Sequence, residues 1–123
     1  MDELKERINS IVESLKKYPE VVAIILYGSY AKGKEKPLSD IDVAVILKDK
    51  SLEAEVSSFS SNILDVVPFH RLPLYIKFEV LKHGKVLFLR DREDFTNVKR
   101  RILRDYLEMS YLYKRMQRRV LSQ

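Results

Sequence analysis

The sequence has no cysteine, only two histidines, few glycines and prolines, and no long apolar run. Without cysteine, a disulfide framework and a thiolate metal site are excluded, and two separated histidines do not make a zinc site by themselves. Three glycines and four prolines in 123 residues exclude collagen-like and low-complexity chains. A globular protein remains, in which metal chemistry on carboxylates is still open.

The longest apolar run covers residues 21–27, far short of the roughly 20 residues that a membrane-spanning helix needs. We therefore expect no membrane anchor. The N-terminus alternates acidic and basic residues and lacks the features of a secretory signal, so we expect a cytoplasmic location. The length suits one compact core, and we predict a single domain over residues 1–123.

The net charge of +5 is concentrated near the C-terminus. Residues 99–119 carry eight basic and two acidic side chains, a local charge of 8 − 2 = +6, so the remainder sums to −1. Charge alone describes steering and solubility. We interpret this segment as the solvated face of a basic helix and do not expect a nucleic-acid partner.

Apolar residues recur at steps of three or four in two stretches, which predicts amphipathic helices at residues 4–15 and 91–120. Pro19 stops the first. The second carries a long stripe formed by Phe95, Val98, Ile102, Tyr106, Met109, Tyr113, Met116 and Val120. Such a stripe packs on its own domain or on a symmetry mate, which would make a homo-oligomer; docking of a different protein is the alternative.

Short, β-branched apolar segments predict buried strands at residues 21–27, 41–47 and 63–67. Residues 51–62 have helical spacing, with Ser51 as a candidate N-cap and four further serines that weaken the helix.

The segment 72–83 fits either an alternating strand or a helix. A hairpin that turns at residues 83–84 is one alternative. Pro73 at a first helical position and Gly84 as a stop favour a helix followed by a strand at residues 85–89.

The chemistry-bearing pattern is Gly28-Ser29, ten residues, then Asp40-Ile41-Asp42. Residues two apart on a strand point to one face, so the two carboxylates lie roughly 6 to 7 Å apart. Next to buried apolar residues, such like charges need a cation, and Mg2+ is the hard ion that carboxylates prefer. The Gly28-Ser29 turn lets backbone N–H groups approach a phosphate. Asp65, on the third predicted strand, could complete the site.

This pattern resembles the minimal nucleotidyltransferase family of the DNA polymerase β-like superfamily. The likeness covers most of the chain, including the turn at residues 28–33, Ser39 before the aspartate pair, the strand around Asp65, and residues 80–88. It implies an α/β (α+β) fold, a small mixed sheet flanked by helices, with a long C-terminal helix. It also implies AMP transfer from Mg-ATP to an acceptor hydroxyl, and, for stand-alone members, an antitoxin role in which a tyrosine of a HEPN-family ribonuclease toxin is adenylylated.

Transferred to this sequence, the resemblance makes Asp40, Asp42 and Asp65 the catalytic residues and metal ligands. Further residues are expected to bind the nucleotide, namely Gly28, Ser29, Lys32 and Ser39. Lys32 stands where members of the family commonly carry arginine, and lysine lacks the bidentate geometry of that residue.

Other titratable residues are assigned structural or surface roles. Glu79 is a rival third carboxylate, but on a helix it faces Lys82 and suits a surface pair. His70 and His83 have no acidic or histidine cluster near them in sequence, so we expect structural or exposed positions. Neither follows an arginine at the spacing of HEPN nucleases, so the chain is not itself that toxin.

A catalytically inactive module is the alternative to an enzyme. Such a protein would hold a nucleotide in the same pocket, or would only dock a partner through the stripe on its C-terminal helix.

Overall fold

The computed structural model describes residues 2–28 and 41–121. The elements follow one another along the chain as α1 (Asp2–Leu15), β1 (Val21–Tyr27), β2 (Ile41–Leu47), η1 (Lys50–Leu52), α2 (Glu53–Ser57), β3 (Leu64–Pro68), η2 (Phe69–Arg71), α3 (Leu74–His83), β4 (Lys85–Leu89) and α4 (Arg92–Leu121). The mixed α+β fold expected from the sequence is confirmed.

The strands form one mixed sheet in the order β3-β2-β1-β4. β1 pairs antiparallel with β2 and with β4, whereas β2 pairs parallel with β3. Both central strands, β1 and β2, are almost wholly buried, as their continuous β-branched sequences predict.

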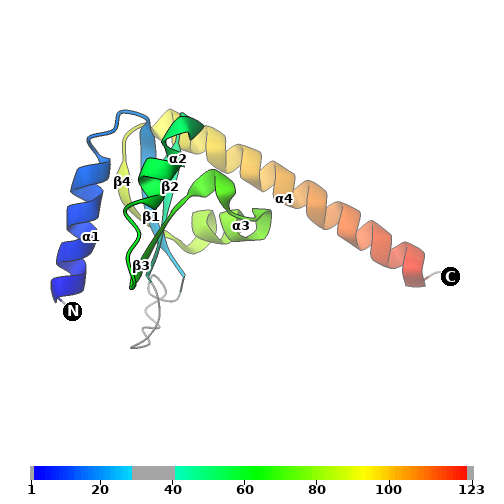
Figure 1. Cartoon of the computed structure of the whole chain (residues 1–123). Helices are drawn as coiled ribbons and strands as arrows, with labels where there is room; N and C mark the ends of the chain where they lie inside the picture. Colours follow the sequence, from blue (N-terminus) through cyan, green and yellow to red (C-terminus); the bar gives the residue numbers. More distant parts are fainter. Residues whose placement is uncertain (1, 29–40, 122–123) are drawn as a thin grey trace.

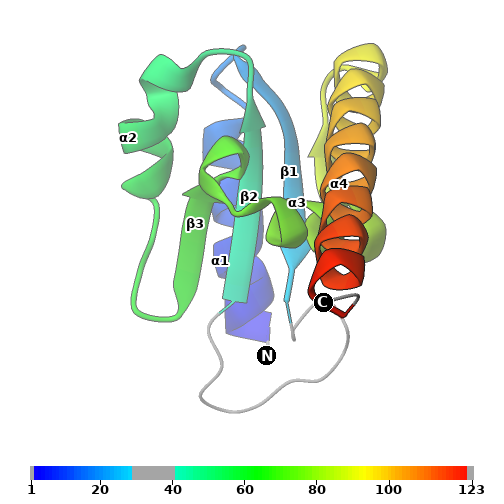
Figure 2. The same ribbon diagram turned by 90° about the vertical axis from the view of Figure 1, so that its right-hand side faces the viewer.

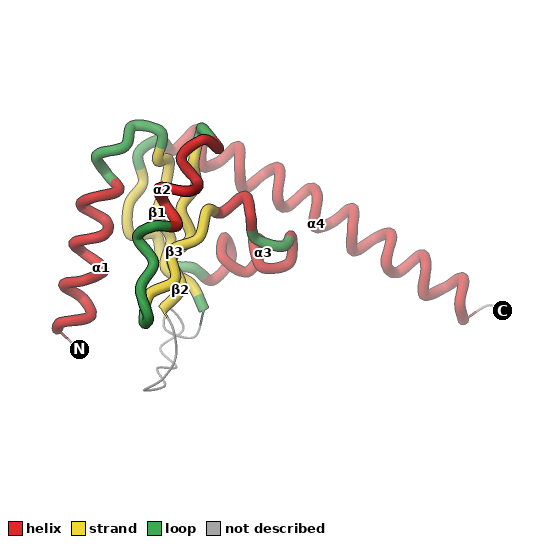
Figure 3. Tube along the Cα trace, in the orientation of Figure 1, coloured by secondary structure: helices red, strands yellow, loops and turns green. Residues whose placement is uncertain are grey.

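Helices cover both faces of the sheet, as Figures 1 and 3 show. α1 and α2 pack on one face around a core that includes Leu15, Val43 and Leu64. α3 and the first part of α4 cover the other face, where Ala44, Val80 and others form a second core. Along β2, side chains alternate between the two cores, so the face on which each of its residues lies follows from its position. In β1 the alternation is interrupted where the register shifts between Val21 and Ala23, and Val22 and Ala23 both belong to the second core.

The helix expected at residues 51–62 is much shorter than predicted: α2 covers five residues after a 3-10 turn. The cap is also different, because the Asp49 side chain accepts a hydrogen bond from the Ser51 N–H at 2.9 Å. Further along, serine hydroxyls compete with the helix for hydrogen bonds to backbone groups. Ser58 Oγ donates to the Glu55 carbonyl, and Ser60 Oγ exchanges hydrogen bonds with the backbone of Val66.

The remaining elements lie close to their expected positions. The ambiguous segment is a helix, α3, with Gly84 as its C-cap, followed by strand β4. β3 is shifted by one residue and includes Pro68, which an edge strand tolerates because its missing N–H faces no partner strand. Within the described residues, no helix combines the length and the apolar character needed to cross a bilayer.

Candidate active site

The candidate site lies where β1 ends beside the start of β2. In the sheet register, Asp42 pairs with Tyr27 on the antiparallel neighbour β1 and with Asp65 on the parallel neighbour β3. Paired residues on adjacent strands project to the same face. This face is the one covered by α3 and α4, because Ala44, two residues after Asp42, belongs to their core. Two of the three predicted carboxylates are therefore brought side by side.

The backbone of Gly28 lies close to the Asp42 side chain. Its φ of +83° is a conformation that favours glycine. A Cβ atom at this position would lie only 2.8 Å from Asp42 Oδ2, closer than atoms pack without a shift. The absence of a side chain therefore lets the backbone at the end of β1 approach the Asp42 carboxylate.

Burial and the two aspartates raise the pKa of the neighbouring Tyr27. Burial, followed by the negative charges of Asp42 and Asp65, raises the pKa of Tyr27 to about 12. The phenol therefore stays neutral well beyond the pH at which an ordinary tyrosine ionises.

A cavity of about 420 Å3 opens between this end of the sheet and α3. It is lined by Tyr27, Gly28, Asp42, Tyr75, Ile76, Glu79, His83 and Gly84. The volume is that of a small-molecule site, and the wall combines apolar and aromatic groups with a few polar ones. Asp42 is the predicted catalytic residue that reaches it, whereas Asp65 is exposed on the far side of Asp42.

The wall provided by α3 was missed by the sequence interpretation. Glu79 was expected to pair with Lys82 on the surface, but it lines the cavity and lies 3.8 Å from His83 Nε2. His83 is exposed, as expected, yet it also lines the cavity. The available signal was the spacing of Tyr75, Glu79 and His83, which recur every four residues and therefore share one helix face.

Four predicted site residues lie outside the described residues: Ser29, Lys32, Ser39 and Asp40. Their expected contacts with phosphate and metal remain predictions.

The described carboxylates suit a hard cation. Asp42 and Asp65 stand on adjacent strands with like charges turned to one face, an arrangement that a divalent ion would neutralise. Among the described residues no group of three or more acidic, histidine or cysteine side chains could hold a metal. A complete ligand set would thus require a further ligand, for which the sequence offers Asp40, directly before β2.

His70, by contrast, has a structural position. Its Nε2 lies 2.6 Å from Glu53 Oε2, and Arg71 holds the same carboxylate through its Nε at 2.8 Å and through a second guanidinium nitrogen. Hydrogen bonds from Arg71 and then His70 lower the pKa of Glu53 to about 2. This cluster fastens α2 to η2, as the structural role predicted for His70 requires.

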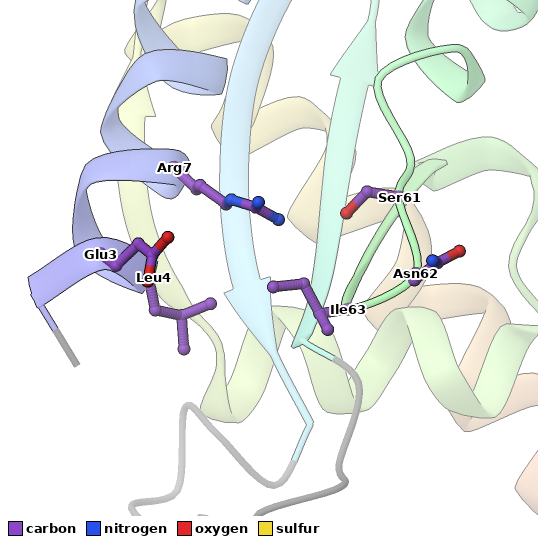
Figure 4. A pocket seen from close by; sticks show the side chains of 6 residues that line it. All are labelled: Glu3, Leu4, Arg7, Ser61, Asn62 and Ile63. Atoms are coloured by element: carbon purple, nitrogen blue, oxygen red, sulfur yellow. The ribbon is translucent and has the colours of Figure 1, made fainter.

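A second cavity, of about 460 Å3, lies at the same end of the sheet but on the α1 side (Figure 4). Arg7 extends from α1 across it toward Ser61, and Glu3 and Leu4 lie beside it in Figure 4. Neither of the predicted catalytic residues that the structure describes, Asp42 and Asp65, lines this cavity. We therefore place the active site on the α3 side.

Residues 9–93 match the family described as Polymerase beta, Nucleotidyltransferase. This range contains the Gly28 turn, both described aspartates and the α3 wall. The match covers more than half of the chain, and the chain therefore belongs to this nucleotidyltransferase family. The DNA polymerase β-like nucleotidyltransferase class expected from the Gly28–Asp42 motif is thereby confirmed.

Individual relatives agree with this assignment. A Methanocaldococcus jannaschii protein named "Putative protein adenylyltransferase" is 42% identical over 69 residues, which make up 56% of this chain and 57% of that protein. The chain thus spans little more than half the length of this curated relative.

Solved structures share the fold. A chain from a toxin–antitoxin complex with AMP-PNP has a TM-score of 0.69 at 21% identity, covering 94% of this chain and 97% of its own. A chain from a complex described as tri-AMPylated Shewanella oneidensis HEPN toxin with MNT antitoxin has a TM-score of 0.68 at 22% identity, covering 98% and 99%. At these identities the likeness establishes the fold.

Proposed function

We propose that this protein transfers AMP from Mg-ATP to a tyrosine hydroxyl of a HEPN-family partner, and that it acts in this way as the antitoxin of the pair. The observation that carries the proposal is the register of Asp42 with Asp65 beside Gly28, at the mouth of a cavity. Family membership supports the transfer chemistry. The partner is supported by two solved structures of similar fold, one from a toxin–antitoxin complex and one from a complex with a HEPN toxin.

Each residue has a role in the proposed reaction. The backbone at Gly28 and the hydroxyl of Ser29 cradle the phosphates, and Lys32 and Ser39 assist in binding the nucleotide. Asp40, Asp42 and Asp65 would hold Mg2+, which when bound neutralises the triphosphate and the leaving pyrophosphate.

The acceptor oxygen attacks the α-phosphorus as the bond from that phosphorus to the bridging oxygen of pyrophosphate breaks in line. Asp65, exposed at the open side of the pair, accepts the proton of the acceptor hydroxyl. AMP is thereby joined to the acceptor, and pyrophosphate leaves.

The test is transfer of labelled AMP from ATP to the purified partner, with Mg2+ and with a chelator. Asp42→Asn and Asp65→Asn should each lower the rate about 100-fold or more, because each removes a charge that acts on the transferring group. The melting temperature of each variant is measured beside its rate, so that a loss of transfer is not mistaken for a loss of the fold. Asp105→Asn, on α4, is the matched control and should transfer normally.

An inactive docking module is the second candidate, and the exposed apolar residues of α4 favour it. Unchanged transfer in both aspartate variants would contradict the roles given to Asp42 and Asp65. Partner binding with no transfer at any Mg2+ concentration would contradict the enzyme and favour the module.

A further inference from the structure

α4 is divided into two parts by what covers it. Near its start, Phe95 and Ile102 are buried against the sheet and α3. Tyr106 then stacks on Phe78 of α3, with ring centroids 4.0 Å apart and planes within 6° of parallel. The C-terminal part of the helix extends away from the rest of the protein, as Figure 1 shows, and nearly all of its residues from 107 to 121 are exposed. Figure 2 shows α3 and α4 beside the sheet, seen from the side that lies to the right in Figure 1.

The same apolar stripe continues along the projecting part. Met109, Tyr113, Met116 and Val120 follow Tyr106 at alternating steps of three and four, so they share one face. Their side chains are 44% to 71% exposed. Of the twelve large hydrophobic residues that are exposed among those described, nine lie on α4 between Leu103 and Leu121. This concentration marks an interaction surface, because single exposed apolar residues are normally scattered.

The residue types at this surface are those of protein interfaces. Tyrosine, methionine and arginine are enriched where proteins meet, and the projecting part combines Tyr111 and Tyr113 with two methionines and three arginines. We call residues 107–121 the distal segment. Its straight stripe, spaced at three and four residues, matches the ridges of another helix.

The charge of the distal segment indicates whether a second copy of this chain or a different protein binds there. The distal segment carries four basic side chains, Lys114, Arg115, Arg118 and Arg119, against the single acidic Glu108. Pairing two copies would bring two segments of +3 together within a Debye length of about 8 Å at physiological salt. A partner with carboxylates beside its apolar ridge would instead meet opposite charges.

From these observations we infer that the distal segment of α4 is the docking surface for a helix of a different protein, one with an apolar ridge flanked by acidic side chains. The inference deepens the proposed function, because it states where the acceptor protein is held and by what chemistry. None of the residues that line the cavity beside Asp42 lies on α4, so variants of the distal segment and of the cavity test binding and AMP transfer separately.

A peptide pair tests the chemistry directly on the full chain. One amphipathic peptide of about four heptads has leucine at its core positions and glutamate at the flanks; its twin has lysine in place of glutamate. Calorimetry should detect binding of the acidic peptide alone. Arg115→Glu/Arg118→Glu should weaken that binding at least tenfold, whereas Lys5→Glu/Arg7→Glu, with the same change in net charge on α1, should leave it unchanged.

The apolar part of the surface needs its own variant. Tyr113→Ser/Met116→Ser should abolish binding of the acidic peptide and of the purified HEPN-family partner while circular dichroism shows an unchanged fold. Asp42→Asn should bind the partner normally but not modify it, which separates a failure of docking from a failure of transfer.

The inference would be overturned by equal binding of the basic peptide, by equal weakening in the α1 variant, or by partner binding that survives Tyr113→Ser/Met116→Ser. A concentration-dependent dimer in sedimentation that this same variant abolishes would also overturn it, since a second copy would then cover the face.

Discussion

Gly28 and Asp42 are the pair of residues on which the geometry of the site depends most directly. Gly28→Ala should destabilise the fold by about 1 to 2 kcal/mol, because a side chain is strained at a φ of +83°. It should also slow AMP transfer, because the new methyl group would displace the Asp42 carboxylate. Urea unfolding and the transfer assay measure the two effects.

A double-mutant cycle separates crowding from backbone strain. In an Asp42→Ala background the carboxylate is gone, so Gly28→Ala should lose less stability there than in the unmodified protein. Equal losses in both backgrounds would mean that backbone strain alone destabilises Gly28→Ala. They would contradict the prediction that the new methyl group crowds the Asp42 carboxylate.

At this scale the sequence motif named three residues that the structure places close together, and their roles in catalysis and binding remain predictions. Gly28, Asp42 and Asp65 were predicted from their residue types and spacing, and the register of β2 with β3 brings the two aspartates together. Tyr75 and Glu79 were missed, because a site wall on a helix has no motif of its own and depends on how α3 packs over the sheet. The site thus combines a local pattern with a tertiary contact that spacing alone does not specify.

At the scale of elements, the ion cluster between α2 and η2 predicts a pH dependence of stability. The pKa of Glu53 falls from its ordinary 4.5 to about 2 in the folded protein, chiefly through its hydrogen bonds from Arg71 and His70. Its stabilising contribution is therefore full above pH 4.5 and is lost as the pH falls toward 2. The melting temperature of the unmodified protein should exceed that of Glu53→Gln at pH 6, and the difference should close by about pH 2.

The control for this titration is Glu6→Gln, on the exposed side of α1. Its melting temperature should follow that of the unmodified protein over the whole pH range. A constant difference between Glu53→Gln and the unmodified protein would show that packing, and not the ionised carboxylate, accounts for the loss.

The same elements show why some predictions from periodicity succeed and others do not. β1 and β2 were predicted within their bounds because buried central strands have continuous β-branched sequences. The helix at residues 51–62 was too long, because the pairing of Ser60 with the Val66 backbone is a contact that helical spacing does not reveal. For α4 the stripe was correct, but periodicity cannot distinguish the half that covers its own sheet from the half that projects.

At the scale of the whole molecule, Arg90 connects the end of β4 to the segment between α1 and β1. It follows β4, and its guanidinium donates hydrogen bonds to three carbonyls around the end of α1 and the start of β1: Val21 at 2.8 Å, Lys16 at 2.5 Å and Tyr18 at 3.2 Å. The guanidinium also lies over the Phe88 ring, 5.1 Å from its centroid. These contacts span about seventy residues of sequence and fix α1 against the sheet edge formed by β4.

Replacing Arg90 should therefore weaken the protein globally and leave the chemistry of the site intact. Arg90→Met keeps the aliphatic contact with Phe88 but removes the donors, and we expect a loss of about 1 to 3 kcal/mol in the free energy of unfolding. Arg90→Lys should recover only part, since one ammonium cannot match the planar fork that reaches three carbonyls. Arg92→Met, an exposed arginine two residues further on, is the control and should change stability by less than about 0.5 kcal/mol. If Arg90→Met unfolds at the same urea concentration as the unmodified protein, the hydrogen bonds of Arg90 do not hold the end of α1 in place. If its stability falls but AMP transfer per folded molecule is unchanged, the contacts of Arg90 stabilise the fold without affecting the site beside Asp42.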